Sequence, residues 1–485
     1  MNSEFSLELL PVIHLPDHPE WVALNQLAWK TAFGNVSKNP YPTWETQVAC
    51  MPGVPIIWTW DSCFIALYSR YSNGHLPALG NLNSLYAHQR EDGYISMAYD
   101  MTKNEPAYGE RVNPPLFAWA ELATARQTGD LDRCRRVLPH LIALFNWYKA
   151  NRRRPDGLYW FEDAGSSGMD NSPRSGYESQ YLNGSDICHV DLISQQAHVA
   201  EVISEIATLL GLPEIATRFT GERQAILSLI GKHWCERTGF YYDLFYRTDT
   251  FAQSHGGHNF VNHRTIASFW PMFAGACSRE QAACLVQALM DPDDFWTPHP
   301  VASLSRKDPN YNPKGGYWLG GVWAPTNYMV VHALRRYGYF AEAKELVRRH
   351  LNAMHRVASD RQFGGIWETY SPELDRPSTK VGEKLVRPNF VGWSGLGPIS
   401  MLIEDILGFE FNALAKEIRW RIAEPGEHGI SNLAYDGGTV SLFFSPATKT
   451  ITIKTDRSFK LTVESDGADR EFSVTAGEHS LSLKD

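Results

Sequence analysis

The sequence predicts a mainly α-helical protein, an (α/α)6 toroid of helical hairpins followed by a small C-terminal antiparallel β-unit. Three observations predict this fold. Between about Phe64 and Phe409, helical runs recur in pairs, separated by a glycine or a small polar turn. The segments between the pairs are rich in Gly, Pro, Trp and His. Over the last ~60 residues, a two-residue alternation replaces the helical period. We therefore expect an (α/α)6-barrel domain over 1–425 and a β domain over 426–485.

About six helical hairpins follow one another along the chain. They cover 63–89; 116–152, with a turn at Thr128-Gly129; 190–234, with a turn at Gly211–Pro213; 266–290, with a turn near Gly275; 327–357, with a turn at Gly338; and a late helix over 394–409. In the hairpin that begins at Val190, apolar residues recur three or four positions apart and form one buried face. A glycine after such a run is a natural helix cap.

Hairpins of this kind either extend as a solenoid or close into a ring. The turns at Gly129, Gly211, Gly275 and Gly338 are not equidistant, whereas a binding solenoid usually keeps a regular period. No convincing strand interrupts the helical region. We therefore expect a closed toroid whose elaborated loops converge at one mouth and form a pocket there.

The C-terminal segment alternates β-branched or aromatic residues with polar ones. The predicted strands are 439–445, 450–456, 459–465 and 470–476, separated by turn-forming residues. We expect this unit to have a structural role, with a sugar-binding module as the alternative.

The bulk composition narrows the function. The chain has 485 residues, 43% of them hydrophobic, and a net charge of -9, which argues against a nucleic-acid partner. No apolar run approaches the roughly 18 residues that a membrane helix needs, and the start of the chain has no basic signal-like region. Seven scattered cysteines without CxxC spacing favour a reducing compartment over disulfides or zinc. We expect a cytoplasmic protein without a cofactor, a nucleic-acid partner or a membrane.

Six connecting segments carry aromatic and polar residues that an ordinary connector does not need. They are 56–64, 111–119, 168–174, 315–328, 364–373 and 390–400. The stretch 165–176, GSSGMDNSPRSG, consists mostly of turn formers, so its own composition predicts only a surface loop around Asp170.

Five short motifs in these segments carry a family resemblance. Residues 58–62 read WTWDS, 111–115 RVNPP, 168–174 GMDNSPR, 321–325 GVWAP and 367–370 WETY. In this order they resemble the inverting α-glycosidases on an (α/α)6 barrel. These are glycoside hydrolase family 63, with its mannosylglycerate and glucosylglycerate hydrolase members, and the related family 37 trehalases. The resemblance covers roughly residues 55–410. Asn113 stands where Gln is usual, and Met169 replaces the trehalase Trp, which puts trehalose itself in doubt.

The resemblance implies that Asp170 is the general acid and Glu368 the general base. Inverting hydrolysis needs two carboxyl groups about 6.5–9.5 Å apart, which leaves room for a water molecule. Asp170 must be partly desolvated, or close to another carboxylate, to stay protonated near neutral pH. Glu373 is the rival base, but the neighbouring Trp367 and Tyr370 favour Glu368, because a water-activating carboxylate needs a shaped, partly apolar site.

Asp61, which follows Trp58 and Trp60, is expected to bind a pair of hydroxyls on the terminal sugar. A sugar's C–H face can lie on an indole while its hydroxyls need fixed polar partners. A single tryptophan is nevertheless more often part of the core. Arg174 is expected to bind substrate hydroxyls or a carboxylate rather than to pair tightly with Asp170. The other expected substrate contacts are Trp58, Trp60, Gln89, Tyr94, Arg111, Asn113, Trp323 and Trp393.

Three histidines, His255, His258 and His263, invite a metal interpretation. Their spacing follows no HExxH pattern and has no adjacent carboxylate, so a polar loop over the mouth is preferred and no metal is expected.

The resulting prediction is an exo-acting inverting glycoside hydrolase that cleaves a terminal α-linked, glucose- or mannose-like sugar from a small or oligosaccharide substrate. A polysaccharide lyase or sugar epimerase on the same scaffold is one alternative, since the histidines and Arg264 resemble parts of a lyase site. A non-catalytic carbohydrate-binding protein is another. The sequence leaves open the sugar and its linkage, the aglycone (glycerate, a monosaccharide or an oligosaccharide) and the oligomeric state.

Overall fold

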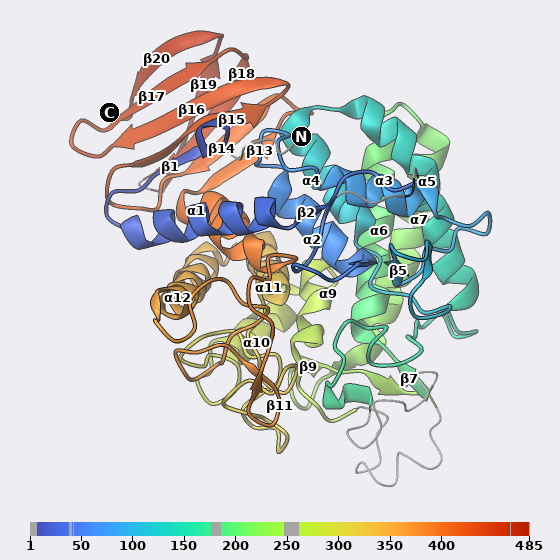
Figure 1. The fold of residues 1–485 in the computed structure, drawn as a ribbon. Coiled ribbons are helices and arrows are strands. Elements are labelled where there is room, and N and C mark those ends of the chain that lie inside the picture. The colour runs from blue at the N-terminus through green and yellow to red at the C-terminus, as the bar shows by residue number, and fades with distance from the viewer. Residues whose placement is uncertain are drawn as a thin grey trace.

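Paired helical segments recur along the chain from Pro19 to Ile406, and a β-sandwich packs on one side of them (Figure 1). The structure is a computed structural model and describes residues 7–37, 41, 43–175, 186–246, 261–465 and 467–484.

The helices fall into two sets. The first set consists of α2 (Thr59–Ser69), α4 (Phe117–Thr128), α6 (Val190–Leu209), η5 (Ile266–Phe269) with α9 (Trp270–Phe273), α11 (Ala324–Arg336), and η6 (Ser394–Leu396) with the π-helix η7 (Gly397–Ile406). A second set is α1 (Pro19–Gly34), α3 (Leu79–Ala87), α5 (Leu131–Asn151), α7 (Pro213–Ile230), α10 (Arg279–Leu289) and α12 (Phe340–Ser359). Short 3-10 turns are η1 (Leu7–Leu9), η2 (Pro173–Ser175) and η4 (Gly231–His233).

The first set of helices forms a closed circuit of contacts. Helix α2 packs on α4, α4 on α6, α6 on α9, and α9 on α11; α11 contacts η6 and η7, and both of these return to α2. The second set covers this circuit from outside: α3 packs on α2, α5 on α4 and α6, α7 on α6, and α12 on α11 and η7. Two helices of the second set remain: α1 lies against α12 and η7, and α10 contacts strand β9 (Phe240–Tyr241).

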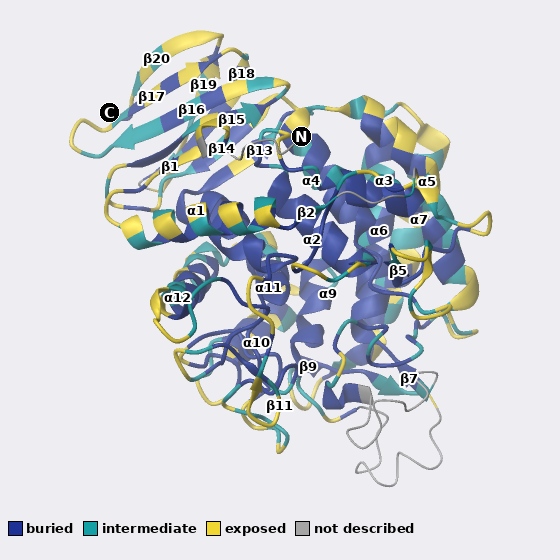
Figure 2. Ribbon diagram, viewed as in Figure 1, coloured by how far each residue is buried: buried dark blue, intermediate teal, exposed yellow. Residues whose placement is uncertain are grey.

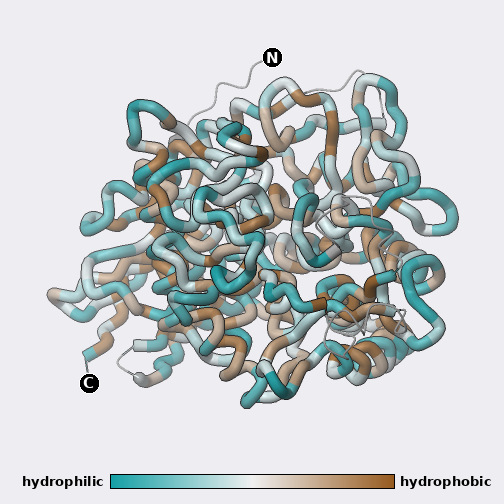
Figure 3. Tube along the Cα trace, turned by 90° about the horizontal axis from the view of Figure 1, so that it is seen from below, coloured by the Kyte–Doolittle hydropathy of each residue, from teal (hydrophilic) through white to brown (hydrophobic). Residues whose placement is uncertain are grey.

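Burial explains which helices lie inside. Every residue of α2 is buried, whereas α7 buries only Phe219, Ile226 and Ile230 (Figure 2). A helix without a polar stripe needs protein on all sides, while an amphipathic one needs it on a single side. Seen from below, the loops at the periphery are largely hydrophilic (Figure 3). Among the described residues, no helix is both long and apolar enough to cross a lipid bilayer.

The predicted turns are confirmed. Gly129 follows α4 with a left-handed φ of 74°, and the Asp130 side chain then caps α5 by accepting from the backbone N–H of Arg133 at 2.8 Å. Gly211 lies between α6 and α7, Gly275 between α9 and α10, and Gly338 between α11 and α12. Helix α1 was not predicted.

The β-sandwich consists of two sheets. One has the order β1-β15-β16-β17-β20 and the other β13-β14-β18-β19. The strands are β1 (Val12–His14), β13 (Phe409–Asn412), β14 (Glu417–Arg421), β15 (His428–Tyr435), β16 (Gly438–Ser445), β17 (Thr450–Thr455), β18 (Phe459–Ser465), β19 (Ala468–Val474) and β20 (Gly477–Ser482). Between the sheets, the Tyr435 ring lies 6.2 Å from Phe411 and 5.6 Å from Phe459, measured between centroids.

The strands of this unit depart from the predicted boundary at 425/426. They begin at Phe409, and β1, from the other end of the chain, pairs with β15 so that Ile13 lies opposite Ile430. Most pairs are antiparallel as expected, but β14 and β18 are parallel. The unit rests on the helices through hydrogen bonds such as Gln127 Nε2 to the Ala434 carbonyl at 2.6 Å.

The connecting segments also contain short strands that the sequence did not predict. They are β2 (Val36–Ser37), β3 (Gln47–Val48), β4 (Ile56–Trp58), β5 (Ala98–Asp100), β6 (Glu105–Pro106), β7 (Ile187–Cys188), β8 (Trp234–Cys235), β9 (Phe240–Tyr241), β10 (Leu244–Phe245), β11 (Thr379–Val381) and β12 (Lys384–Leu385). Among them, β7 and β11 lie at the end of the molecule away from the β-sandwich (Figure 1). With two or three residues each, these strands hold loop bases in place without forming a layer of their own.

Candidate active site

A cavity of about 290 Å³ opens where several helices of the inner circuit begin. Trp58, Trp60 and Asp61 reach it from the start of α2, Asn113 from the segment before α4, and Trp393 from the segment before η6. Its other lining residues are Met51, Met97, Tyr108, Arg111, Gly165, Gly168, Asp170, Tyr317, Glu368, Lys380, Arg387 and Phe390. The cavity thus brings three carboxyl groups together from distant parts of the chain.

A chain of tight turns positions Asp170. The Asp163 side chain accepts from the backbone N–H of Ser166 at 2.8 Å, and the N–H of Gly168 donates to the Gly165 carbonyl at 3.0 Å. Beyond the acid, Asn171 bonds in both directions to the segment 316–318, with its Nδ2 donating at 3.0 Å and its Oδ1 accepting at 2.9 Å. The loop is therefore fixed on both sides of the carboxyl group.

The pKa of Asp170 is raised to about 6. Loss of hydration among the surrounding groups is the largest cause; attraction to Lys380 opposes it, and repulsion from Glu368 adds to it. Protein groups surround the carboxyl group of Asp170, but the residue also has exposed surface in the cavity and can be reached from solvent. A carboxyl group in this state can give a proton to a bound molecule near neutral pH.

Glu368 has a different environment. The residue is only 3% exposed, and two donors hold its carboxylate: the Tyr317 hydroxyl bonds Oε1 at 2.9 Å and the backbone N–H of Arg387 bonds Oε2 at 3.2 Å. Its backbone carbonyl accepts from Trp393 Nε1 at 2.8 Å. These contacts hold the Glu368 carboxylate in one orientation, which suits a base.

Asp61 is the third carboxyl group of the cavity. Burial raises its pKa to about 8, opposed by a hydrogen bond with the Cys50 thiol and reinforced by repulsion from Glu368 and Asp170. A buried carboxyl group beside Trp58 and Trp60 is suited to hydrogen-bond neutral hydroxyls.

Three basic side chains complete the cavity wall. Arg111 pairs with Asp163, Nη2 to Oδ2, at 2.9 Å, and Lys380 Nζ lies 4.4 Å from the centre of the Tyr317 ring. Arg387 follows β12 and also lines the cavity. Among the described residues, no group of three or more His, Cys, Asp or Glu side chains could hold a metal ion.

A protein-family comparison assigns the chain. Residues 54–384 match the family model described as the mannosylglycerate hydrolase MGH1-like glycoside hydrolase domain. The chain belongs to this glycoside hydrolase family. It is accordingly a hydrolase, and the lyase, epimerase and non-catalytic alternatives are set aside.

Individual relatives agree with the family. An uncharacterized protein of Borreliella burgdorferi is 28% identical over 77% of this hydrolase and 76% of its own length. A probable mannosyl-oligosaccharide glucosidase of Schizosaccharomyces pombe is 23% identical over 81% of this chain but only 46% of its own. The crystal structure of the GH63 mannosylglycerate hydrolase from Thermus thermophilus, in complex with glucose, superposes with a TM-score of 0.63 at 21% identity, covering 78% of this chain and all of that one. This last likeness concerns the fold.

Eight of the residues predicted from sequence line the cavity of the glycoside hydrolase. They are Trp58, Trp60, Asp61, Arg111, Asn113, Asp170, Glu368 and Trp393. Glu373, the rival base, does not line it; its carboxylate accepts from the Tyr311 hydroxyl at 2.9 Å and pairs with Arg306.

Four predicted contacts lie elsewhere. Arg174 is 1% exposed, and its guanidinium makes two hydrogen bonds to each of Asp191 and Asp243, at 2.6–2.8 Å, so the substrate-binding prediction for it is wrong. Trp323 is fully buried and stacks on Trp318 at 4.0 Å, behind the cavity wall rather than in it.

Gln89 and Tyr94 are also not among the lining residues, and their side chains brace loops instead. Gln89 Nε2 donates to the carbonyls of Gly93 and His140, both at 3.0 Å. The Tyr94 hydroxyl donates to the Arg111 carbonyl at 2.8 Å, so it supports a cavity residue from behind.

Sequence reasoning missed several lining residues, among them Tyr317, Lys380 and Arg387. Tyr317 lies inside a segment singled out for its aromatics, and Arg387 lies three positions before another. Lys380 belongs to no motif; β11 pairs with β12, and the backbone of Thr379 bonds to Lys314 and Tyr317, which places Lys380 at the cavity. His255 and His258 lie outside the described residues, whereas His263 Nδ1 bonds Asp308 at 2.6 Å.

Proposed function

We propose that this hydrolase is an exo-acting inverting α-glycosidase, in which Asp170 is the general acid and Glu368 the general base, on an (α/α)6 toroid. The observation that carries the proposal is the contrast between the two carboxyl groups of one cavity. Asp170 has its pKa raised to about 6, whereas two hydrogen-bond donors hold Glu368. Pairs of carboxyl groups in opposite environments are what acid and base roles require.

In the proposed reaction, Asp170 gives its proton to the glycosidic oxygen as the bond to the anomeric carbon breaks. Glu368 takes a proton from a water molecule, whose oxygen forms the new bond on the opposite face of the sugar ring. The aglycone leaves as an alcohol, and the configuration at the anomeric carbon inverts. Asp61, Trp58 and Trp60 hold the terminal sugar.

The basic side chains of the cavity favour an aglycone with a carboxylate. Arg111, Lys380 and Arg387 all line the cavity, and Arg111 keeps 39% of its side chain exposed although it pairs with Asp163. An arginine fork suits carboxylate recognition. We therefore propose a glucosyl- or mannosylglycerate as the substrate. The glycerate of the relatives named mannosylglycerate hydrolase is of this kind.

Two further proposals concern the whole chain. We assign the β-sandwich a structural role, because it packs on the ends of the helices where β13 and β15 contact α4. We also propose action in a reducing, cytoplasmic compartment, which the seven free cysteines favour.

A substrate screen with anomer detection tests the function. The full chain is incubated with α-linked disaccharides and with glycosyl-glycerates, and proton NMR reads the anomer that appears first. We expect hydrolysis of a glycosyl-glycerate with initial release of the β-anomer. Initial release of the α-anomer would contradict inversion, and hydrolysis of neutral disaccharides alone would contradict the anionic aglycone.

A further inference from the structure

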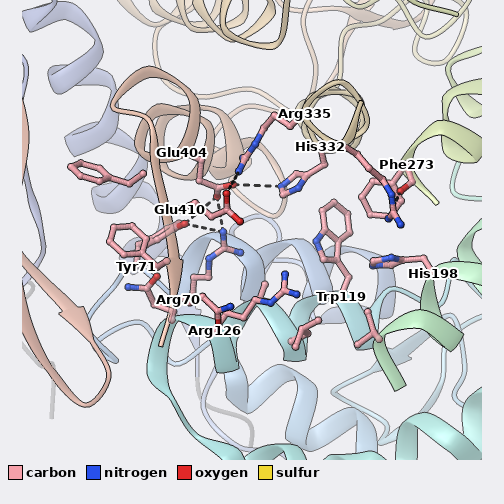
Figure 4. Close-up of a pocket in the computed structure, with 18 of the residues that line it drawn as sticks. Arg70, Tyr71, Trp119, Arg126, His198, Phe273, His332, Arg335, Glu404 and Glu410 are labelled. Carbon is pink, nitrogen blue, oxygen red and sulfur yellow. Dashed lines mark hydrogen bonds and ion pairs between the residues drawn. The ribbon is translucent and has the colours of Figure 1, made fainter. Parts of the chain in front are cut away.

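A second, larger cavity of about 430 Å³ lies where the inner helices end (Figure 4). Helix α2 begins at Trp60 and Asp61 in the catalytic cavity, and Arg70 and Tyr71, which follow its last residue, line the second one. Helix α11 also ends at the second cavity, where its final turns supply His332, Arg335 and Arg336. Strand β13 of the sandwich closes the other side. The helical circuit therefore has a cavity at each end.

The arginines of the second cavity all have carboxylate partners, and Glu404 is shared by two of them. Arg70 Nη2 lies 2.6 Å from Glu404 Oε1, Arg126 Nη2 lies 2.6 Å from Glu205, and Arg336 Nη2 lies 2.7 Å from Glu201. Arg335 shares Glu404 with Arg70, and it also lies near Asp405 and near Glu410, which lines the cavity. Figure 4 shows Arg70, Arg335 and His332 directed toward Glu404. With every arginine matched by a carboxylate, and helix C-termini adding partial negative charge, the cavity has no surplus of positive charge for an anion.

A ligand in the second cavity can reach both a hydrogen-bond donor and a hydrogen-bond acceptor. Arg126 keeps 40% of its side chain exposed and Glu410 57%, so one donor head and one acceptor head are open to a ligand. Burial lowers the pKa of His332, whose neutral ring carries one donor and one acceptor. Both ring nitrogens of His198 and Nη1 of Arg70 are enclosed in the wall.

Aromatic rings form the rest of the wall. The cavity is lined by Tyr71, Trp119, Phe273, Phe340, Phe409 and Phe411. A hydroxyl group both donates and accepts, and the C–H face of a sugar packs on aromatic carbon. Balanced charge, mixed donors and acceptors, and aromatic walls together match a neutral polyhydroxylated molecule better than an anion or an apolar ligand.

We propose that this cavity is a second carbohydrate site, which binds a neutral sugar of one or two rings without cleaving it. Of the carboxyl groups that line it in the described part of the chain, Glu404 is held ionised by its partners, with its pKa lowered to about 2, so it is not available to give a proton to a bound sugar. The site is independent of the catalytic assignment and would exist even if that assignment failed.

The experiment measures sugar binding in a chain whose catalytic cavity is blocked. Asp61→Leu removes the carboxyl group that we place on the terminal sugar, and calorimetry then follows titration with D-glucose or D-mannose. Ala123→Trp is added to fill the second cavity from α4, which Ala123 lines. Ala225→Trp, at an exposed position of α7, is the matched control.

We expect the Asp61→Leu chain to bind one sugar, the Ala123→Trp double variant to bind at least tenfold more weakly, and the Ala225→Trp double variant to bind unchanged. In the otherwise unaltered chain, Ala123→Trp should leave hydrolysis as it was. Arg126→Ala replaces Ala123→Trp in the same test if the larger substitution fails to fold. Absence of binding to Asp61→Leu, or binding that survives both cavity variants, would overturn the proposal. Tenfold tighter binding of glucose 6-phosphate than of glucose would overturn the neutral ligand class.

Discussion

Replacing Lys380 by Met should move the pH dependence of hydrolysis in a direction that the structure fixes. Burial raises the pKa of Asp170 to about 6, and the charge of Lys380 is the largest effect that opposes it. Lys380 is half-buried on β11, with Nζ over the Tyr317 ring. Methionine keeps a side chain of similar length against that ring and removes the charge.

The size of the change follows from the position of Lys380. An opposite charge within about 4–6 Å lowers the pKa of a carboxyl group by roughly 1–3 units. Water screens a half-buried lysine, so the lower end of this range applies, about one unit or ~1.4 kcal/mol. Since hydrolysis needs protonated Asp170, kcat/KM falls as the pH rises through its pKa. The midpoint of this basic limb, near 6 in the unaltered enzyme, should lie near ~7 in Lys380→Met.

The assay is kcat/KM against pH, with each profile scaled to its own maximum so that a change in substrate affinity cancels. Lys384→Met, at an exposed position on the paired strand β12, is the control and should leave the midpoint in place. The groups that most affect the pKa of Asp61 besides burial are Cys50, Glu368 and Asp170, so a limb caused by Asp61 would move little. A midpoint that stays or falls in Lys380→Met would refute the assignment of Asp170 as the acid.

Four further predictions concern single side chains. Asp170→Asn and Glu368→Gln should each remove nearly all hydrolysis while circular dichroism and Tm stay unchanged; more than a few per cent of residual turnover would mean that the role is wrongly assigned. Tyr317→Phe removes one of the two donors to the Glu368 carboxylate, so we expect kcat to fall about tenfold, for a loss of ~1.4 kcal/mol, with KM little changed. Arg174→Met leaves two buried aspartates without their partner and should cost about 3–5 kcal/mol in denaturant unfolding. By contrast, Arg111→Met should raise KM with little effect on stability. If Arg174→Met raised KM and Arg111→Met lowered stability instead, the placement of Arg174 in the core and of Arg111 at the substrate would both be wrong.

The helical hairpins could be predicted because their signals are local. A three-to-four-residue apolar period followed by glycine is enough to place α4, α6 and α11, since helix and cap are both formed by neighbours in the chain. Strands β16, β17 and β18 were predicted for the same reason. The entry of β1 into the sandwich was not, because three residues carry no pattern of their own and pair with a strand more than 400 positions away.

The residues of the candidate site also divide into those that the sequence could predict and those that it could not. Motif residues such as Trp60 and Glu368 could be found because the family resemblance preserves their order. Lys380 could not, since what brings it to Asp170 is the fold of an unremarkable loop. Arg174 shows the opposite error. It lies four residues from the proposed acid, so sequence proximity suggested a shared task, but its guanidinium turns away to Asp191 and Asp243.

The two interpretations of the loop around Asp170, as an ordinary turn and as a catalytic element, describe the same physical arrangement. Gly168 has a φ of +78°, which favours glycine, and a Cβ at that position would lie 3.4 Å from the Trp60 ring. The glycine therefore lets the backbone turn directly over the indole that is proposed to hold the sugar, and Asp170 follows two residues later. A helix or strand would impose its own side-chain direction on the acid. The turn formers leave that direction to the contacts of Asp163 and Asn171 on either side, which is how a stretch of ordinary turn residues can aim one carboxyl group into a cavity.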